Sequence, residues 1–235
     1  MTKTKKVPFQ FKNEVKNGKH VLTLSGNVQK KYWRDDDVIN AKDIRESLDT
    51  VTDDIVIKLN SPGGDVFEGI EIYNYLKDHP SNITVEVTGL AASAASIVAM
   101  GADELVMNIG TSLMVHEAST ILWGNKTEIA KELKALETID TSLVDIYADK
   151  TKQSAEVINN WITEETWFTA ENAVESKLAD RVKNSVKAKV EVMDISTMIN
   201  DSVAKILKGM EFEEKPKETV NSMVLKNLQK LGGIN

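Results

Sequence analysis

The chain has 235 residues, of which 28% are charged and 41% hydrophobic, as in a soluble protein with one core domain of about 150–200 residues and some additional sequence. It contains no cysteine and three histidines, which excludes a disulfide framework and a cysteine nucleophile and leaves few ligands for a metal site. The net charge of −7 argues against nucleic acid as a partner.

The most apolar run, residues 89–102, is shorter than the roughly 18 residues that span a bilayer. The Lys-rich N-terminus lacks the apolar core of a signal peptide. We therefore expect a cytoplasmic protein that uses no membrane, metal or cofactor.

The first half of the chain predicts alternating strands and helices. Residues 1–17 are polar and predict a flexible lead-in, residues 20–26 predict a strand, and Asn40 is a suitable N-cap for a short helix. The later segments continue the alternation, with a strand at 55–59, a helix from 65, a strand at 83–87, a helix at 92–101, and strands at 105–107 and 113–115. This order predicts an α/β fold with right-handed crossovers.

The second half is mostly helical. Residues 127–150 predict the longest helix, with one apolar side that can pack on the domain or on a neighbouring subunit. Shorter helices are expected after Ser154 and Thr169, which are good N-caps. The composition then changes, so we assign residues 18–184 to the core domain and residues 185–235 to a C-terminal extension with helices and a charged linker.

Ser93 is a candidate nucleophile. It lies in the sequence Gly-Leu-Ala-Ala-Ser-Ala-Ala-Ser, after a predicted strand and at the start of an apolar helix. Small neighbours let a substrate backbone approach, and unpaired amides at a helix start can stabilise an oxyanion. Taken alone, the segment is explained more simply as a packed helix that Ser93 caps. Ser96 is expected to be a packing residue one turn along.

His116 is the best placed of the three histidines to act as a general base. It follows the predicted strand 113–115, and active sites of α/β sheets lie at strand ends. A partly buried structural histidine is the simpler interpretation of this position alone. His20, which opens a strand, and His79, which precedes a proline, lie in weaker contexts.

Residues 60–64, Asn-Ser-Pro-Gly-Gly, interrupt the chain between a buried strand and a helix. The two glycines permit a positive φ and leave a backbone amide open to a ligand. The loop lacks the Lys-Ser/Thr pair of a Walker loop and the glycine spacing of a dinucleotide loop. Two glycines after Ser-Pro suggest a close approach of another group.

Together, these segments resemble the ClpP peptidase family. Its Asn-Ser-Pro-Gly-Gly, Gly-x-Ala-Ala-Ser and Met-Ile-His motifs correspond to residues 60–64, 89–93 and 114–116. Its acid segment, Asp-Arg-Phe-Leu-Ser-Ala, corresponds to residues 165–170, and the resemblance extends over about residues 18–183. It implies an α/β fold that is a ClpP/crotonase-like spiral of repeated β-β-α units, with an extra long helix and the C-terminal extension.

The resemblance also implies roles for five residues, with Ser93 as nucleophile, His116 as base, Glu165 as the acid that orients the imidazole, and the amides of Gly64 and Ala94 as the oxyanion hole. The family has Asp at the position of Glu165 and Met at the position of Ala94. A glutamate can still reach an imidazole, and only the amide of Ala94 is needed. Glu164 is the alternative acid, and two solvated carboxylates without a catalytic role are the simpler interpretation of this pair.

The implied activity is that of a serine endopeptidase that cleaves proteins or peptides through an acyl-enzyme. The family implies a ring-shaped homo-oligomer of about six or seven subunits per ring, stacked through the long helix. Use of an ATPase partner is left open. The Glu-Thr-Trp-Phe segment and the C-terminal extension resemble the ClpP-like proteases of phage and prophage head modules, which implies cleavage of capsid or scaffold protein in prohead maturation.

Three alternatives remain open. A crotonase-type acyl-CoA enzyme shares this kind of fold and oxyanion hole but has no need of Ser93 and His116 together. A signal-peptide peptidase with a Ser/Lys dyad is disfavoured by the lack of an apparent membrane anchor. A catalytically silent ring subunit is disfavoured by the presence of serine, histidine and acid, and labelling with a fluorophosphonate distinguishes it from an active enzyme.

Overall fold

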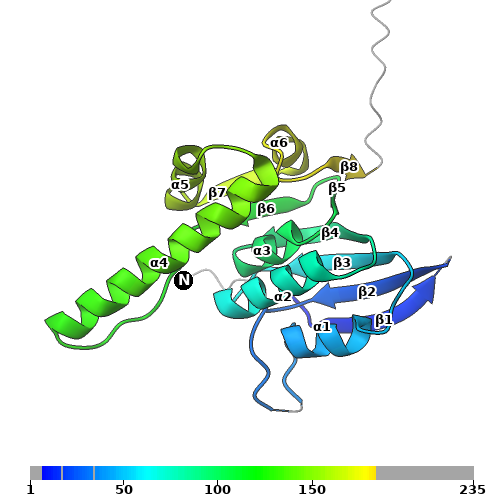
Figure 1. Ribbon diagram of the computed structural model, residues 1–235, viewed down its shortest axis with the longest axis horizontal. Coiled ribbons are helices and arrows are strands. Elements are labelled where there is room, and N and C mark those ends of the chain that lie inside the picture. The colour runs from blue at the N-terminus through cyan, green and yellow to red at the C-terminus, as the bar shows by residue number, and fades with distance from the viewer. Residues whose placement is uncertain (1–6, 17, 34, 184–235) are drawn as a thin grey trace, which may run out of the picture. The chain divides into compact units, whose positions relative to one another are not determined.

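The computed structural model describes residues 7–16, 18–33 and 35–183 (Figure 1). Their elements are, in chain order, β1 (Gln10–Lys16), β2 (Lys19–Ser25), α1 (Ala41–Leu48), β3 (Ile55–Ser61), α2 (Val66–Asp78), β4 (Ile83–Ala92), α3 (Ala94–Met100), β5 (Glu104–Asn108), β6 (Ser112–Val115), α4 (Lys126–Thr151), α5 (Ala155–Thr163), β7 (Thr166–Thr169), α6 (Ala170–Glu175) and β8 (Arg181–Lys183). The expected extension over residues 185–235 lies outside the described residues. Within the described ranges, no helix is both long and apolar enough to cross a membrane.

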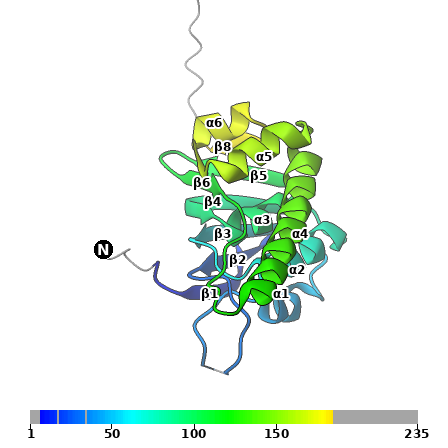
Figure 2. The ribbon, with the colours of Figure 1, turned by 90° about the vertical axis from the view of Figure 1, so that its left-hand side faces the viewer.

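The strands form one mixed sheet in the order β1-β2-β3-β4-β5-β8, to which β6 and β7 are joined through β4. The inner strands β2 to β5 are parallel, whereas β1 is antiparallel to β2 and β7 to β6. Helices α1 to α4 lie on one side of the sheet (Figure 2). Apolar side chains of the central strands are fully buried, including Ile57, Leu59, Val85 and Val87. This architecture confirms the α/β class expected from the sequence.

Strand β4 changes partner halfway along its length, and this change positions the candidate site. Residues 84–87 pair with 104–107 of β5, whereas residues 90–92 pair with 112–114 of β6. The Asn60 side chain lies at the change and accepts a hydrogen bond from the amide of Leu90 at 3.1 Å. Because β4 and β6 are parallel neighbours there, the residues that follow the two strands emerge side by side.

The expected lead-in over residues 1–17 is wrong in its second part. Residues 10–16 form β1, which pairs with β2 from Gln10↔Ser25 to Lys16↔Lys19. The side chains of β1 are mostly exposed, and only Phe11 packs against the core. A polar strand at the edge of a sheet has no hydrophobic alternation, so the sequence pattern did not reveal it.

Helix α4 begins one residue before, and ends one residue after, the expected range of 127–150. Asn125 and Glu128 form a capping box at its start. Only the C-terminal half has buried side chains, which are Leu143, Val144, Ile146, Tyr147 and Thr151. The other half extends away from the sheet (Figure 1). The buried half of α4 therefore forms a wall beside α3, where the candidate site lies.

Candidate active site

Ser93 occupies a tight turn between β4 and α3. Its backbone has φ 55° and ψ −129°, which is an unfavourable conformation for a residue with a Cβ atom. The Ser93 amide donates to the carbonyl of Met114 at 2.9 Å and so continues the pairing of β4 with β6. Although Ser93 is the N-cap residue of α3, its side chain makes no capping hydrogen bond. The hydroxyl is thus directed to another partner.

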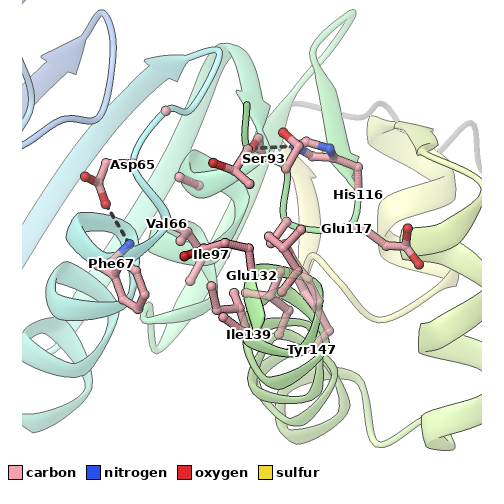
Figure 3. A pocket seen from close by; sticks show the side chains of 18 residues that line it. Asp65, Val66, Phe67, Ser93, Ile97, His116, Glu117, Glu132, Ile139 and Tyr147 are labelled. Carbon is pink, nitrogen blue, oxygen red and sulfur yellow. Dashed lines mark hydrogen bonds between the residues drawn. The ribbon is translucent and has the colours of Figure 1, made fainter. Parts of the chain in front are cut away.

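That partner is His116, the residue directly after β6. Its Nε2 lies 2.7 Å from the Oγ of Ser93 (Figure 3). The contact follows from strand register, because Ala92 pairs with Met114, so Ser93 and His116 lie just beyond the same end of the β4–β6 pair. A serine hydroxyl at this distance can transfer its proton to a neutral imidazole. The structure therefore brings together the two residues that the sequence proposed as nucleophile and base.

The glycine loop after β3 lies against the Ser93 turn. A Cβ atom on Gly63 would approach the Ala92 carbonyl to 2.5 Å and the Cβ of Ser93 to 2.7 Å. Gly64 has φ 146°, and a Cβ there would lie 2.1 Å from the carbonyl oxygen of Val28. Both positions require glycine because backbone approaches on the side where a side chain would project. The loop is thereby held next to the candidate nucleophile.

The amides of Gly64 and Ala94 are available to a ligand. Both residues line the same cavity as Ser93 and His116. Among the described residues, neither amide takes part in a hydrogen bond. Two such donors beside a nucleophile are the arrangement that stabilises a tetrahedral oxyanion.

The cavity has a volume of about 420 Å³ and a floor of apolar side chains. Figure 3 shows Ser93 and His116 at its upper edge and the side chains of α4 below them. Most of its apolar lining comes from three helices and includes Val66, Phe67, Ile97, Ala135, Leu136, Ile139, Leu143 and Tyr147. A cavity of this kind can hold an apolar side chain of an extended peptide.

Glu165 lies close to His116 in the sheet register but is not bonded to it. The pairing of β6 with β7 runs from Ser112↔Thr169 to Val115↔Thr166 and stops there. His116 directly follows the last paired residue of β6, and Glu165 directly precedes β7, in a turn with φ 49°. The Glu165 carboxylate is exposed and accepts a hydrogen bond from Nε1 of Trp167 at 3.3 Å. In the part of the chain that the structure describes, no hydrogen bond joins Glu165, or its neighbour Glu164, to the imidazole.

A second carboxylate near His116, that of Asp140 on α4, had no distinctive sequence signal. Its Oδ1 accepts a hydrogen bond from the amide of Ala118, two residues after His116, at 2.7 Å. Burial raises the pKa of Asp140, and the negative charge of Glu117 raises it further, whereas the Ala118 amide and the charge of His116 act in the opposite direction. In the sequence, Asp140 is one of many acidic residues on a long helix, and only the fold places it behind the histidine.

Comparison with known proteins gives a family for this chain. The model of the family described as Clp protease matches residues 44–186, which is more than half of the chain. ATP-dependent Clp protease proteolytic subunit 1 of Protochlamydia amoebophila is 33% identical over 135 residues, covering 56% of this chain and 66% of the relative. Proteolytic subunit 2 of Corynebacterium diphtheriae is 30% identical over 158 residues, covering 65% and 79% of the two chains.

A solved structure shows the same fold. A point mutant of ClpP1 from Listeria monocytogenes superposes with a TM-score of 0.56 at 24% identity, covering 61% of this chain and 83% of that chain. This likeness confirms the ClpP-like fold expected from the sequence motifs. The match spans just under two thirds, 66%, of the first relative's length. On the family match, the chain belongs to the Clp protease family.

Proposed function

We propose that this chain is a serine endopeptidase that works through an acyl-enzyme. The 2.7 Å contact between Ser93 Oγ and His116 Nε2, at a strained turn beside two amides that have no partner among the described residues, carries this proposal. His116 removes the hydroxyl proton as Ser93 Oγ bonds to the scissile carbonyl carbon. The intermediate then collapses, the C–N bond breaks, and the imidazolium gives its proton to the leaving amine. Water, deprotonated by His116, hydrolyses the resulting ester.

The amides of Gly64 and Ala94 would hold the oxyanion of the intermediate. Support comes from their place in the cavity wall next to Ser93 and from their lack of partners among the described residues. Preorganised donors of this kind contribute about 3–4 kcal/mol of transition-state stabilisation each. The strained Ser93 turn fits this role, because Ser93 and Ala94 line the same cavity.

Glu165 is proposed as the acid that orients His116. Its support is its place directly before β7, next to the last β6–β7 pair, Val115↔Thr166, which His116 directly follows. An exposed carboxylate held only by Trp167 can rotate towards the imidazole at little cost when substrate binds. Asp140 is the competing acid, because its half-buried carboxylate already accepts a hydrogen bond from the segment after the histidine.

The substrate class that fits is an extended polypeptide with an apolar side chain in the cavity. The relatives are named proteolytic subunits of an ATP-dependent protease, and this chain shares their family. We extend the inference to capsid or scaffold protein of a phage or prophage head, which is supported by the Glu-Thr-Trp-Phe segment at residues 165–168. Co-expression with the capsid and scaffold proteins of a phage head module should give specific cleavage, and unchanged substrates would contradict this assignment.

The proposed assembly is a ring-shaped homo-oligomer that associates through the exposed half of α4. Ile129 and Leu133 on this half, and Ile121 and Trp123 in the preceding loop, are exposed apolar side chains. Surfaces of this kind commonly mark an interface. Sedimentation of the full chain should show a species of about six or seven subunits or a multiple of it. An active monomer at micromolar concentration would contradict this assembly.

The activity itself is tested by treatment with a fluorophosphonate and mass spectrometry of the intact chain. Wild type should gain one adduct, and the Ser93→Ala variant should gain none. A catalytically silent subunit or a crotonase-type enzyme would leave the wild type unlabelled. Labelling of both proteins would show that a residue other than Ser93 reacts.

A further inference from the structure

A chain of buried hydroxyl groups connects helix α4 to the backbone of Ser93. Ser96 Oγ donates a hydrogen bond to the Ser93 carbonyl at 2.6 Å, and the hydroxyl of Tyr147 lies 2.8 Å from the same Oγ. A serine hydroxyl has one proton, which the Ser93 carbonyl receives, so Tyr147 is the donor in the second bond. The direction of the chain is therefore from Tyr147 to Ser96 to Ser93.

Both side chains are inaccessible to water. Ser96 is 0% exposed and Tyr147 1% exposed. Burial raises the pKa of Tyr147, which keeps its hydroxyl protonated and able to donate. A buried hydroxyl without a partner is strongly unfavourable, so each member of the chain depends on the next. The sequence interpretation of Ser96 as a simple packing residue did not include this role.

The Ser93 carbonyl is where such a chain has the most effect. The φ of 55° at Ser93 is unfavourable and persists only when the surrounding contacts favour it. Rotation of the Ser93 backbone towards a relaxed conformation would move its carbonyl oxygen away from Ser96. The buried hydroxyl groups of Ser96 and Tyr147 would then lose the hydrogen-bonded chain that ends at this carbonyl. The free-energy cost of that loss opposes the rotation.

Leu143 and Tyr147, one turn apart on α4, both line the cavity at Ser93. Tyr147 appears below Ser93 in Figure 3, on the wall formed by α4. An apolar residue could fill this volume without a polar atom to satisfy. A tyrosine whose hydroxyl reaches Ser96 is thus explained better by an effect on the Ser93 turn than by packing alone.

We propose that Tyr147 and Ser96 are positioning residues that hold Ser93 in the conformation needed for attack. This rests on the proposed function of Ser93 as nucleophile. Neither residue touches the substrate's reacting atoms; they act through the Ser93 carbonyl. Their loss should lower the rate of bond formation at Ser93 Oγ more than it weakens substrate binding.

The test uses Tyr147→Phe, Ser96→Ala and the double variant in the full chain. We measure kcat and KM with a peptide substrate, the rate of fluorophosphonate labelling, and the thermal unfolding midpoint. Each single variant should lower kcat and the labelling rate by about 10- to 100-fold, with KM within about twofold of wild type. The double variant should be no slower than the slower single variant, because either substitution breaks the same chain.

Thr151→Val is the matched control. Thr151 is 0% exposed on the same helix, and its hydroxyl donates to the Tyr147 carbonyl at 2.7 Å without reaching Ser93. It should lose stability in the manner of Tyr147→Phe but keep the wild-type labelling rate. Equal labelling of Tyr147→Phe and wild type would overturn the positioning role, as would an equal loss in Thr151→Val. An unreactive wild type would instead contradict the proposed function, and the positioning role with it.

Discussion

The two sides of the candidate site differ in how firmly the fold holds them. Ser93 and His116 follow β4 and β6, which pair in the interior, and their side chains are in direct contact. Glu165 precedes the edge strand β7, and among the described residues its exposed carboxylate accepts a hydrogen bond from Trp167 alone. The proposed nucleophile and base are therefore preformed, while the carboxylate of the proposed acid stays adjustable. The difference indicates that backbone pairing determines the positions of Ser93 and His116, whereas side-chain rotation determines the position of the Glu165 carboxylate.

Ser93→Ala should have the largest effect on the firmly held side. Removal of the nucleophile should lower peptidase turnover by up to about 10⁶-fold, because the members of such a unit act together. The thermal unfolding midpoint should hardly change, since the Ser93 side chain makes no capping bond. Ser119→Ala is the control, because Ser119 lines the same cavity but is exposed. Equal turnover of Ser93→Ala and wild type would remove Ser93 from the mechanism.

Glu165→Gln tests the adjustable side. If Glu165 orients His116, loss of its charge should lower turnover by about 10⁴-fold, because the unproductive imidazole tautomer becomes favoured. Glu165→Asp should recover part of the rate, since the charge remains while the reach is shorter. Far-ultraviolet circular dichroism should show an intact fold in both variants.

Glu164→Gln and Asp140→Asn are the comparisons for this prediction, measured in the same turnover assay. Near-normal turnover of Glu165→Gln with a large loss in Glu164→Gln would mean that the acid lies one residue earlier. A large loss of turnover only in Asp140→Asn would mean that Asp140 on α4, and not Glu165, orients His116. Both sides of the site would then be held firmly by the fold.

Gly64→Ala, in the glycine loop, should have an intermediate effect on turnover. The new Cβ would overlap the Val28 carbonyl, so the loop must move and the Gly64 amide with it. Loss of one oxyanion donor lowers turnover by about 10²- to 10³-fold. Gly110→Ala controls for backbone strain, because Gly110 also has a positive φ, of 80°, but has no atom within 4 Å of a Cβ there. Equal turnover in the two variants would exclude a role of the Gly64 amide.

Asp140→Asn should have the smallest effect of these variants. The effect should be a change in how the free energy of unfolding depends on pH. The raised pKa of Asp140 means that ionisation is less favourable in the folded chain than in the unfolded chain. Wild type should therefore lose stability relative to Asp140→Asn as the pH rises from below about 4 towards neutrality. The amide can still accept from Ala118, so the comparison isolates the charge. Asp145→Asn, at an exposed position of α4, controls for the loss of one negative charge.

Urea unfolding at several pH values measures this difference. The opposite trend, with wild type gaining on Asp140→Asn as the pH rises, would show that the ionised carboxylate is favoured by a positive partner such as protonated His116. That result would indicate that Asp140 interacts with His116 in the candidate site. It would also weaken the contrast between the two sides of the site.

Local patterns in the sequence were sufficient to predict the α/β class and the main elements. The buried strand at residues 55–59 and the long helix at 127–150 both have clear hydrophobic periodicity. The loop at 60–64 and the small residues around Ser93 are likewise informative on their own, because glycine and alanine are needed where backbones approach closely. These signals are local because they depend on the conformation of a few consecutive residues.

Contacts between distant residues were decided only by the tertiary structure. The Ser96–Tyr147 bond joins residues 51 positions apart, and Asp140 reaches Ala118 across 22 positions. Such contacts depend on strand register and helix packing, which no single segment encodes. The sequence could therefore propose Ser93 and His116 as partners, but the 2.7 Å distance between them depends on how β4 and β6 pair in the folded chain.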